Sequence, residues 1–199
     1  MLNEKKQPIL TQMSNKKRLK QRIKTSIEFS RNLFVTGAIT ETSRKVEVEI
    51  CKYVPKDRDV VIVEFGMGHG NITKSILNKI SPNSKLYAFE VNEEFCDHVR
   101  KSIQDERLEI INDGAENMKN HISQPIDSVI SSIPFSFFSK EKGLGIIQDA
   151  YDSLSNKAYY SQVLYTKFNF KKFQMIFDDC ELKKFNGIPT EYIYHCQKK

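Results

Sequence analysis

The sequence predicts an α/β protein built on a seven-stranded, mostly parallel sheet that is flanked by helices. Three observations carry this prediction. A strand, a glycine-rich turn and a helix follow one another over residues 59–73, strand and helix patterns then alternate, and two strand-like segments close the chain. With 199 residues, 39% of them hydrophobic and 28% charged, the chain is long enough for one domain with a full core. We therefore expect one globular domain at residues 29–199, preceded by a separate arm at residues 1–28.

The arm is predicted from its charge and from a helical pattern. Residues 1–24 carry eight lysine or arginine side chains and one glutamate, a net charge of +7, whereas the whole chain carries +6. Leu19, Ile23 and Ile27 recur every four residues, which predicts a basic amphipathic helix. Such a helix is typical of an anionic membrane surface or of a nucleic-acid arm, and a solvated helix packed on the domain is the third interpretation. Gly37 is a candidate cofactor-binding position or simply a turn.

The first strand and its turn contain the candidate cofactor loop. Residues 60–63 are an apolar, β-branched run of the kind found inside a parallel sheet, and an apolar helical pattern resumes at Ile72. Between them stand Gly66, Gly68 and Gly70, with Glu64 two positions before the first glycine. Glycines suit a tight turn where a cofactor lies against bare backbone. The spacing is G-x-G-x-G, which differs from the G-x-G-x-x-G of dinucleotide-binding folds.

The next two predicted strands each end in a carboxylate. Residues 85–90 form a strand pattern that ends at Glu90, and residues 108–113 form another that ends at Asp113. An acid at the tip of the second strand can accept hydrogen bonds from the ribose hydroxyls of a nucleoside. A carboxylate after the third strand can accept one from the exocyclic amine of adenine. Together the two acids predict an adenosine site along one edge of the sheet.

The remaining chain supplies a candidate acceptor loop and the closing strands. Residues 127–135 are predicted as a fourth strand and its exit loop. The loop resembles the Asn/Asp-Pro-Pro-Tyr-like tetrapeptide of enzymes that methylate amines, in which a side chain and a carbonyl hold the amine under an aromatic ring. The candidate catalytic residues are therefore Ser132, Pro134 and Phe135. Later segments are predicted as helix, strand, helix, strand and strand over residues 143–153, 159–165, 168–177, 182–185 and 192–196.

The cysteines and histidines are dispersed along the chain. There are four of each and no C-x-x-C pair, so we expect neither a metal site nor a disulfide framework. No apolar run approaches 18 residues and the N-terminal residues lack an apolar signal segment, so neither a membrane span nor a secretory signal is predicted. We expect a reducing, cytoplasmic location.

The motifs resemble those of bacterial phospholipid N-methyltransferases, which carry a Rossmann-like class I domain that uses S-adenosylmethionine (AdoMet). The resemblance extends over residues 29–199 and rests on the segments 31–39, 63–70, 89–90, 131–135 and 186–194. It implies AdoMet as the cofactor and no metal. It also implies the site residues. Glu64, Gly66, Gly68 and Gly70 would shape the cofactor loop, Glu90 would bind the ribose, Asp113 would bind the adenine, and residues 132–135 would face the acceptor amine.

The resemblance predicts transfer of methyl groups from AdoMet to the amine of a membrane phospholipid, from phosphatidylethanolamine towards phosphatidylcholine. The basic arm would then attach the enzyme peripherally to the inner face of the membrane, and no obligate protein partner is evident. Another aminolipid, such as ornithine lipid, is an alternative acceptor. Ribosomal RNA adenine dimethyltransferases share the glycine loop, Glu90 and a related tetrapeptide, so RNA methylation is a further alternative, with nucleic acid the less favoured partner. A module that binds AdoMet or lipid without catalysis is the non-enzymatic interpretation.

Overall fold

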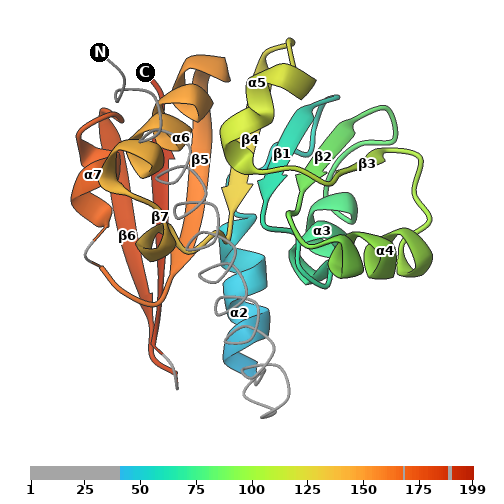
Figure 1. Ribbon diagram of the computed structural model, residues 1–199, viewed down its shortest axis with the longest axis horizontal. Coiled ribbons are helices and arrows are strands. Elements are labelled where there is room, and N and C mark those ends of the chain that lie inside the picture. The colour runs from blue at the N-terminus through green and yellow to red at the C-terminus, as the bar shows by residue number, and fades with distance from the viewer. Residues whose placement is uncertain (1–40, 168, 188–189) are drawn as a thin grey trace, which may run out of the picture. The chain divides into compact units, whose positions relative to one another are not determined.

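The computed structural model describes residues 41–167, 169–187 and 190–199 (Figure 1). Residues Glu41–Lys199 cluster as one compact unit. The predicted arm at residues 1–28 and the candidate position Gly37 lie outside the described residues, so both stay predictions.

The described chain alternates strands and helices. The strands are β1 (Val61–Phe65), β2 (Lys85–Phe89), β3 (Leu108–Ile111), β4 (Ile126–Ser131), β5 (Leu154–Leu164), β6 (Asp179–Phe185) and β7 (Glu191–Gln197). The helices are α2 (Glu41–Ile50), α3 (Asn71–Leu77), α4 (Glu93–Ser102), α5 (Met118–His121), α6 (Lys140–Ser153) and α7 (Phe170–Gln174), with short 3₁₀ turns η1 (Ala115–Asn117) and η2 (Phe135–Phe137). None of the helices in the described part of the chain is long and apolar enough to cross a membrane.

The strands form one sheet in the order β3-β2-β1-β4-β5-β7-β6, which can be followed in Figure 1. β1 lies inside the sheet and pairs in parallel with β2 and β4, and the parallel pairing continues to β3 and β5. β7 runs antiparallel to both of its neighbours, β5 and β6. The predicted seven-stranded, mostly parallel sheet with one antiparallel strand is confirmed. Because β1 to β4 are parallel, the loops that follow them gather at one edge of the sheet.

Helices cover both faces of the sheet. On one face α2 and α3 bury residues such as Ile50 against Ile62 of β1, and α4 adds a smaller apolar cluster. On the other face α5, α6 and α7 contribute residues such as Phe173, which pack in the same cluster as Val63 of β1. Successive residues of a strand point to opposite faces, so a strand covered on both sides is apolar at most of its positions. This explains the apolar run of residues 60–63, which precedes Glu64 in β1.

Several elements differ in their bounds from those predicted, and β6, for example, begins at Asp179 instead of residue 182. β5 begins at Leu154, five residues early, and an irregularity in its pairing with β4 absorbs the additional length, with Lys157 at a φ of 64°. Residues 115–121 form η1 and α5, which are too short to show a helical pattern. α6 begins at Lys140 because Ser139 caps it by accepting a hydrogen bond from the backbone N–H of Lys142.

The prediction of no disulfide is wrong for one pair of cysteines. Cys180 of β6 and Cys196 of β7 lie directly opposite each other, with their Cα atoms 4.1 Å apart, and form a disulfide. The two residues are 16 positions apart in the sequence, and only the antiparallel pairing brings them together. Cys51 and Cys96 are free and buried.

Candidate cofactor and acceptor site

Three glycines form the loop between β1 and α3. Gly66, Gly68 and Gly70 have φ values of 80°, 53° and 82°, in the left-handed region that glycine adopts without strain. A Cβ on Gly66 would approach Ile133 Cγ2 to 3.0 Å and Ser132 Oγ to 3.1 Å. Beside Gly68, apart from its chain neighbours, no heavy atom of the described residues lies within 4 Å of the corresponding position. The loop is therefore close to the chain after β4 on one side and open to a ligand at Gly68.

Glu90 follows β2 and is hydrogen-bonded to the glycine loop. Its Oε2 accepts a hydrogen bond of 3.0 Å from the N–H of Gly68, and its Oε1 accepts one of 2.9 Å from the N–H of Asn92. Burial raises the pKa of Glu90, and these backbone hydrogen bonds act in the opposite direction. Each carboxylate oxygen has a second lone pair, so Glu90 can hold the loop and still accept the two ribose hydroxyls.

Glu64 is the buried acid of β1. The residue is only 1% exposed, and its Oε2 accepts a 2.7 Å hydrogen bond from Thr73 Oγ1 of α3. Burial is the main cause that raises the pKa of Glu64 to about 8; the Thr73 hydrogen bond acts in the opposite direction, and the neighbouring Glu90 adds a smaller upward effect. Glu64 Oε1 has no hydrogen-bond partner within the described residues. An ammonium group, such as that of the amino-acid part of AdoMet, would satisfy this buried acceptor.

Asp113 lies after β3 on the same edge of the sheet and is already held by local hydrogen bonds. Its Oδ1 accepts hydrogen bonds of 2.7 Å from the N–H of Gly114 and from Asn117 Nδ2, and its Oδ2 lies 2.9 Å from His121 Nε2. The bond to His121 is the main cause that lowers the pKa of Asp113. The carboxylate is therefore ionised and fixed, and its contact with adenine stays a prediction.

Ser132 connects the loop after β4 to the glycine loop. Its hydroxyl donates a 2.6 Å hydrogen bond to the carbonyl of Gly66, and its N–H donates one of 2.9 Å to the carbonyl of Phe65. Gln162 of β5 supports the same loop, because its Nε2 donates to the carbonyl of Ile133 at 3.1 Å. Pro134 follows at the start of η2 and is partly exposed. The candidate acceptor loop thus lies against the candidate cofactor loop.

Phe135, the third candidate catalytic residue, packs in the core. It is 0% exposed, and its ring centroid lies 5.5 Å from that of Phe173 and 6.0 Å from that of Phe138. In this packing the ring anchors the loop to the core. A contact between the ring and an acceptor amine stays a prediction, and it requires Phe135 to leave this cluster.

Two residues that orient the acids were missed by the sequence analysis. Thr73 binds Glu64, and Asn92 both binds Glu90 and caps α4 by accepting a 3.0 Å hydrogen bond from the N–H of Glu94. An asparagine directly before two glutamates is a recognisable helix start, so the cap could have been found. Thr73 carries no comparable pattern.

The fold is the Rossmann-like fold of class I AdoMet-dependent methyltransferases. Residues 62–157 match the protein family described as the methyltransferase domain, which contains the glycine loop, Glu90, Asp113 and the Ser132 loop. The fold places the loop and both acids along the edge where parallel strands end, and the open space at Gly68 and the unpaired Glu64 oxygen fit the cofactor. The prediction of AdoMet as the cofactor is confirmed.

Particular relatives are similar over part of the chain. A protein of Methanocaldococcus jannaschii, provisionally named a methyltransferase, is 32% identical over an alignment of 130 residues that covers 61% of this chain and 48% of that protein. Ribosomal RNA small subunit methyltransferase H of Flavobacterium johnsoniae is 29% identical over an alignment of 99 residues that covers 46% of this chain and 32% of that protein. The chain thus spans less than half the length of either curated relative.

A solved structure supports the fold. A protein from Streptococcus mutans, provisionally named a methyltransferase and solved in complex with S-adenosylhomocysteine, superposes with a TM-score of 0.63, covering 78% of this chain and 97% of that chain. The two sequences are 16% identical, so this likeness concerns the fold alone.

Proposed function

We propose that this protein transfers a methyl group from AdoMet to the amine of a membrane phospholipid, with phosphatidylethanolamine as the first candidate. The observation that carries the transfer is the hydrogen bond from Ser132 Oγ to the carbonyl of Gly66, which joins the acceptor loop to the cofactor loop. Two features of the sequence support a lipid acceptor: the motif resemblance over residues 29–199 and the net charge of +7 on residues 1–24. Each lysine or arginine near an anionic membrane contributes about 1 kcal/mol of binding.

The protein would act mainly by positioning. When bound, AdoMet supplies the methyl group, which forms a bond to the amine nitrogen as its bond to sulfur breaks and leaves a thioether. Glu90 and the glycine loop would hold the cofactor, and the Ser132 loop would hold the acceptor amine beside it. The amine attacks only after it has lost its proton. Removal of the amine from water into a partly buried site would favour the neutral amine over the ammonium form, because desolvation disfavours the charged form.

Methylation of RNA is the second candidate function. It is favoured by the similarity to the ribosomal RNA methyltransferase of Flavobacterium johnsoniae, although this chain covers only 32% of that protein. The basic residues at 1–24 would then neutralise phosphates of RNA instead of lipid head groups.

The test is a methyl-transfer assay with two acceptors in parallel. Labelled AdoMet is incubated with liposomes of phosphatidylethanolamine and an anionic lipid, and separately with ribosomal RNA. We expect label in the lipid. The label should be lost on deletion of residues 1–24, and also when their eight lysine and arginine residues are changed to glutamine, a control that keeps the chain length. Label found only in RNA would overturn the lipid proposal and make RNA the methyl acceptor. AdoMet binding by calorimetry with no label in either acceptor would overturn both proposals while leaving the cofactor site intact.

A further inference from the structure

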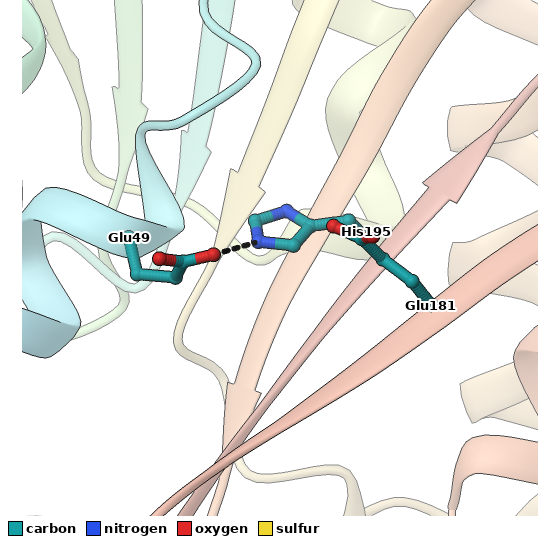
Figure 2. A group of neighbouring side chains, drawn as sticks. All are labelled: Glu49, Glu181 and His195. Atoms are coloured by element: carbon teal, nitrogen blue, oxygen red, sulfur yellow. Dashed lines mark ion pairs between the residues drawn. The ribbon is translucent and has the colours of Figure 1, made fainter.

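Apart from the cofactor site, a group of side chains of the kinds that bind metals lies where α2 packs on the β6–β7 side of the sheet. Glu49 comes from α2, Glu181 from β6 and His195 from β7, and Figure 2 shows their side chains converging. One ligand atom of each lies within 4.8 Å of the ligand atoms of the others. In the sheet register His195 stands in the same row as Glu64 but three strands away, a separation of about 14 Å. The group is therefore distinct from the cofactor site.

Two buried atoms of this group have no hydrogen-bond partner among the residues that the structure describes. These atoms are His195 Nε2 and Glu49 Oε1, and His195 is only 1% exposed. They face each other at 3.7 Å (Figure 2), which is too long for a hydrogen bond. Two ligands of one tetrahedral zinc ion are separated by about 3.4 Å, given bonds of roughly 2.1 Å. An ion between the two atoms would thus satisfy both after a small adjustment.

The other ring nitrogen of His195 is already engaged. Its Nδ1 lies 2.8 Å from Ser161 Oγ of β5. When Nδ1 carries the hydrogen and donates it to Ser161, the lone pair of Nε2 points toward Glu49. A metal-ligating histidine is commonly oriented by a hydrogen bond of this kind from its second nitrogen. Burial also lowers the pKa of His195 to about 4, so the imidazole is neutral at physiological pH, which is the form that binds metals.

The basic side chains around the group engage one oxygen of each carboxylate. Lys183 Nζ lies 2.5 Å from Glu49 Oε2, and Lys52 Nζ lies 3.1 Å from Glu181 Oε1. Tyr53 donates a further 3.0 Å hydrogen bond to the same oxygen of Glu181. These contacts hold both carboxylates in place and leave the second oxygen of each for an ion.

We propose that Glu49, Glu181 and His195 bind one divalent transition-metal ion of the zinc class, with water as a fourth ligand. A set of one imidazole nitrogen and two carboxylate oxygens suits zinc, whereas magnesium and calcium prefer oxygen ligands alone. The ion would fasten α2 to the β6–β7 pair, segments that are distant in the sequence. The proposal is independent of the methyl acceptor.

Zinc binding by the full-length chain tests the proposal. The protein is treated with a chelator, dialysed without reductant so that the Cys180–Cys196 disulfide stays closed, and titrated with zinc chloride by calorimetry. We expect one zinc ion per chain, counted by mass spectrometry of the metal. Substitution of either carboxylate, Glu49→Gln or Glu181→Gln, should weaken binding by roughly tenfold or more, because loss of even an outer-shell partner has effects of that size.

The variants separate a loss of the ligand from a loss of the fold. Glutamine matches glutamate in size, and its oxygen still accepts a hydrogen bond from the neighbouring lysine, so circular dichroism should be unchanged. Glu191→Gln, on β7 but outside the group, is the matched control and should keep wild-type affinity. Cobalt substitution should give the intense visible bands of a tetrahedral site. Absence of zinc binding by the wild type, or wild-type affinity in Glu49→Gln, would overturn the proposal.

Discussion

Replacing Glu64 with glutamine should remove a pH dependence from the stability of the fold. Burial raises the pKa of this carboxyl to about 8 from an ordinary value of 4.5. In the unfolded chain it ionises near the ordinary value, so above that pH the folded state holds a proton that the unfolded state has released. The free energy of unfolding of the wild type therefore falls as pH rises from about 4.5 to about 8, and this loss is complete above the folded pKa.

The size of the effect follows from the two pKa values. Each unit of difference corresponds to about 1.36 kcal/mol. Between pH 5 and pH 8 the ionisation of this one carboxyl in the unfolded chain lowers the free energy of unfolding of the wild type by about 3 kcal/mol. The glutamine variant cannot ionise. The free energy of unfolding of the wild type minus that of Glu64→Gln should therefore fall by about 3 kcal/mol across this interval.

Urea unfolding of both proteins at pH 5 and pH 8, without AdoMet, measures this difference. Glu109→Gln, which removes an exposed carboxylate from β3, is the control for a general change in charge. A difference between wild type and Glu64→Gln that stays constant within about 0.5 kcal/mol would refute the reasoning, because Glu64 would then ionise in the folded protein as it does in the unfolded chain.

Three further substitutions test the loop, the ribose contact and the disulfide. Gly70→Ala should lower the urea midpoint by the equivalent of about 1–2 kcal/mol, because its Cβ would lie 3.0 Å from Ile103 Cδ1 at a φ of 82°; an unchanged midpoint would contradict the strain argument. Glu90→Gln should weaken AdoMet binding, measured by calorimetry, by about tenfold or more while the fold is kept, and wild-type affinity would remove Glu90 from the ribose site. Cys180→Ser should lower Tm in the absence of reductant, because the bond to Cys196 contributes roughly 3 kcal/mol; wild type with reductant should fall to the same Tm.

The cofactor edge could be predicted because its residues are determined by local sequence. Glu64 and the three glycines lie in one continuous segment that runs from β1 into α3, so strand, turn and helix patterns place them together. Glu90 and Asp113 come directly after β2 and β3, and parallel pairing of neighbouring strands brings such positions to one edge without any further information.

The remaining features depend on packing between segments that are far apart in the chain. Phe135 stands at the sequence position expected of an acceptor contact. In the structure its ring packs in the core against Phe173, which α7 supplies. Glu49 and His195 meet only because α2 packs beside β7, and 145 intervening residues carry no pattern that indicates this contact. The cross-strand disulfide likewise follows from the register of β6 and β7 and from no local spacing.

The position of β7 between β5 and β6 imposes an order on folding during synthesis. β6 is an edge strand that, within the described sheet, pairs with β7 alone, and β7 comes after it in the chain. A nascent chain that has left the ribosome as far as Phe185 therefore has β6 without a partner and an open edge on β5. Open strand edges are templates for aggregation, so at this stage the chain exposes such edges until β7 is available. Sheet closure must wait for residues 191–197, which complete both pairings at once.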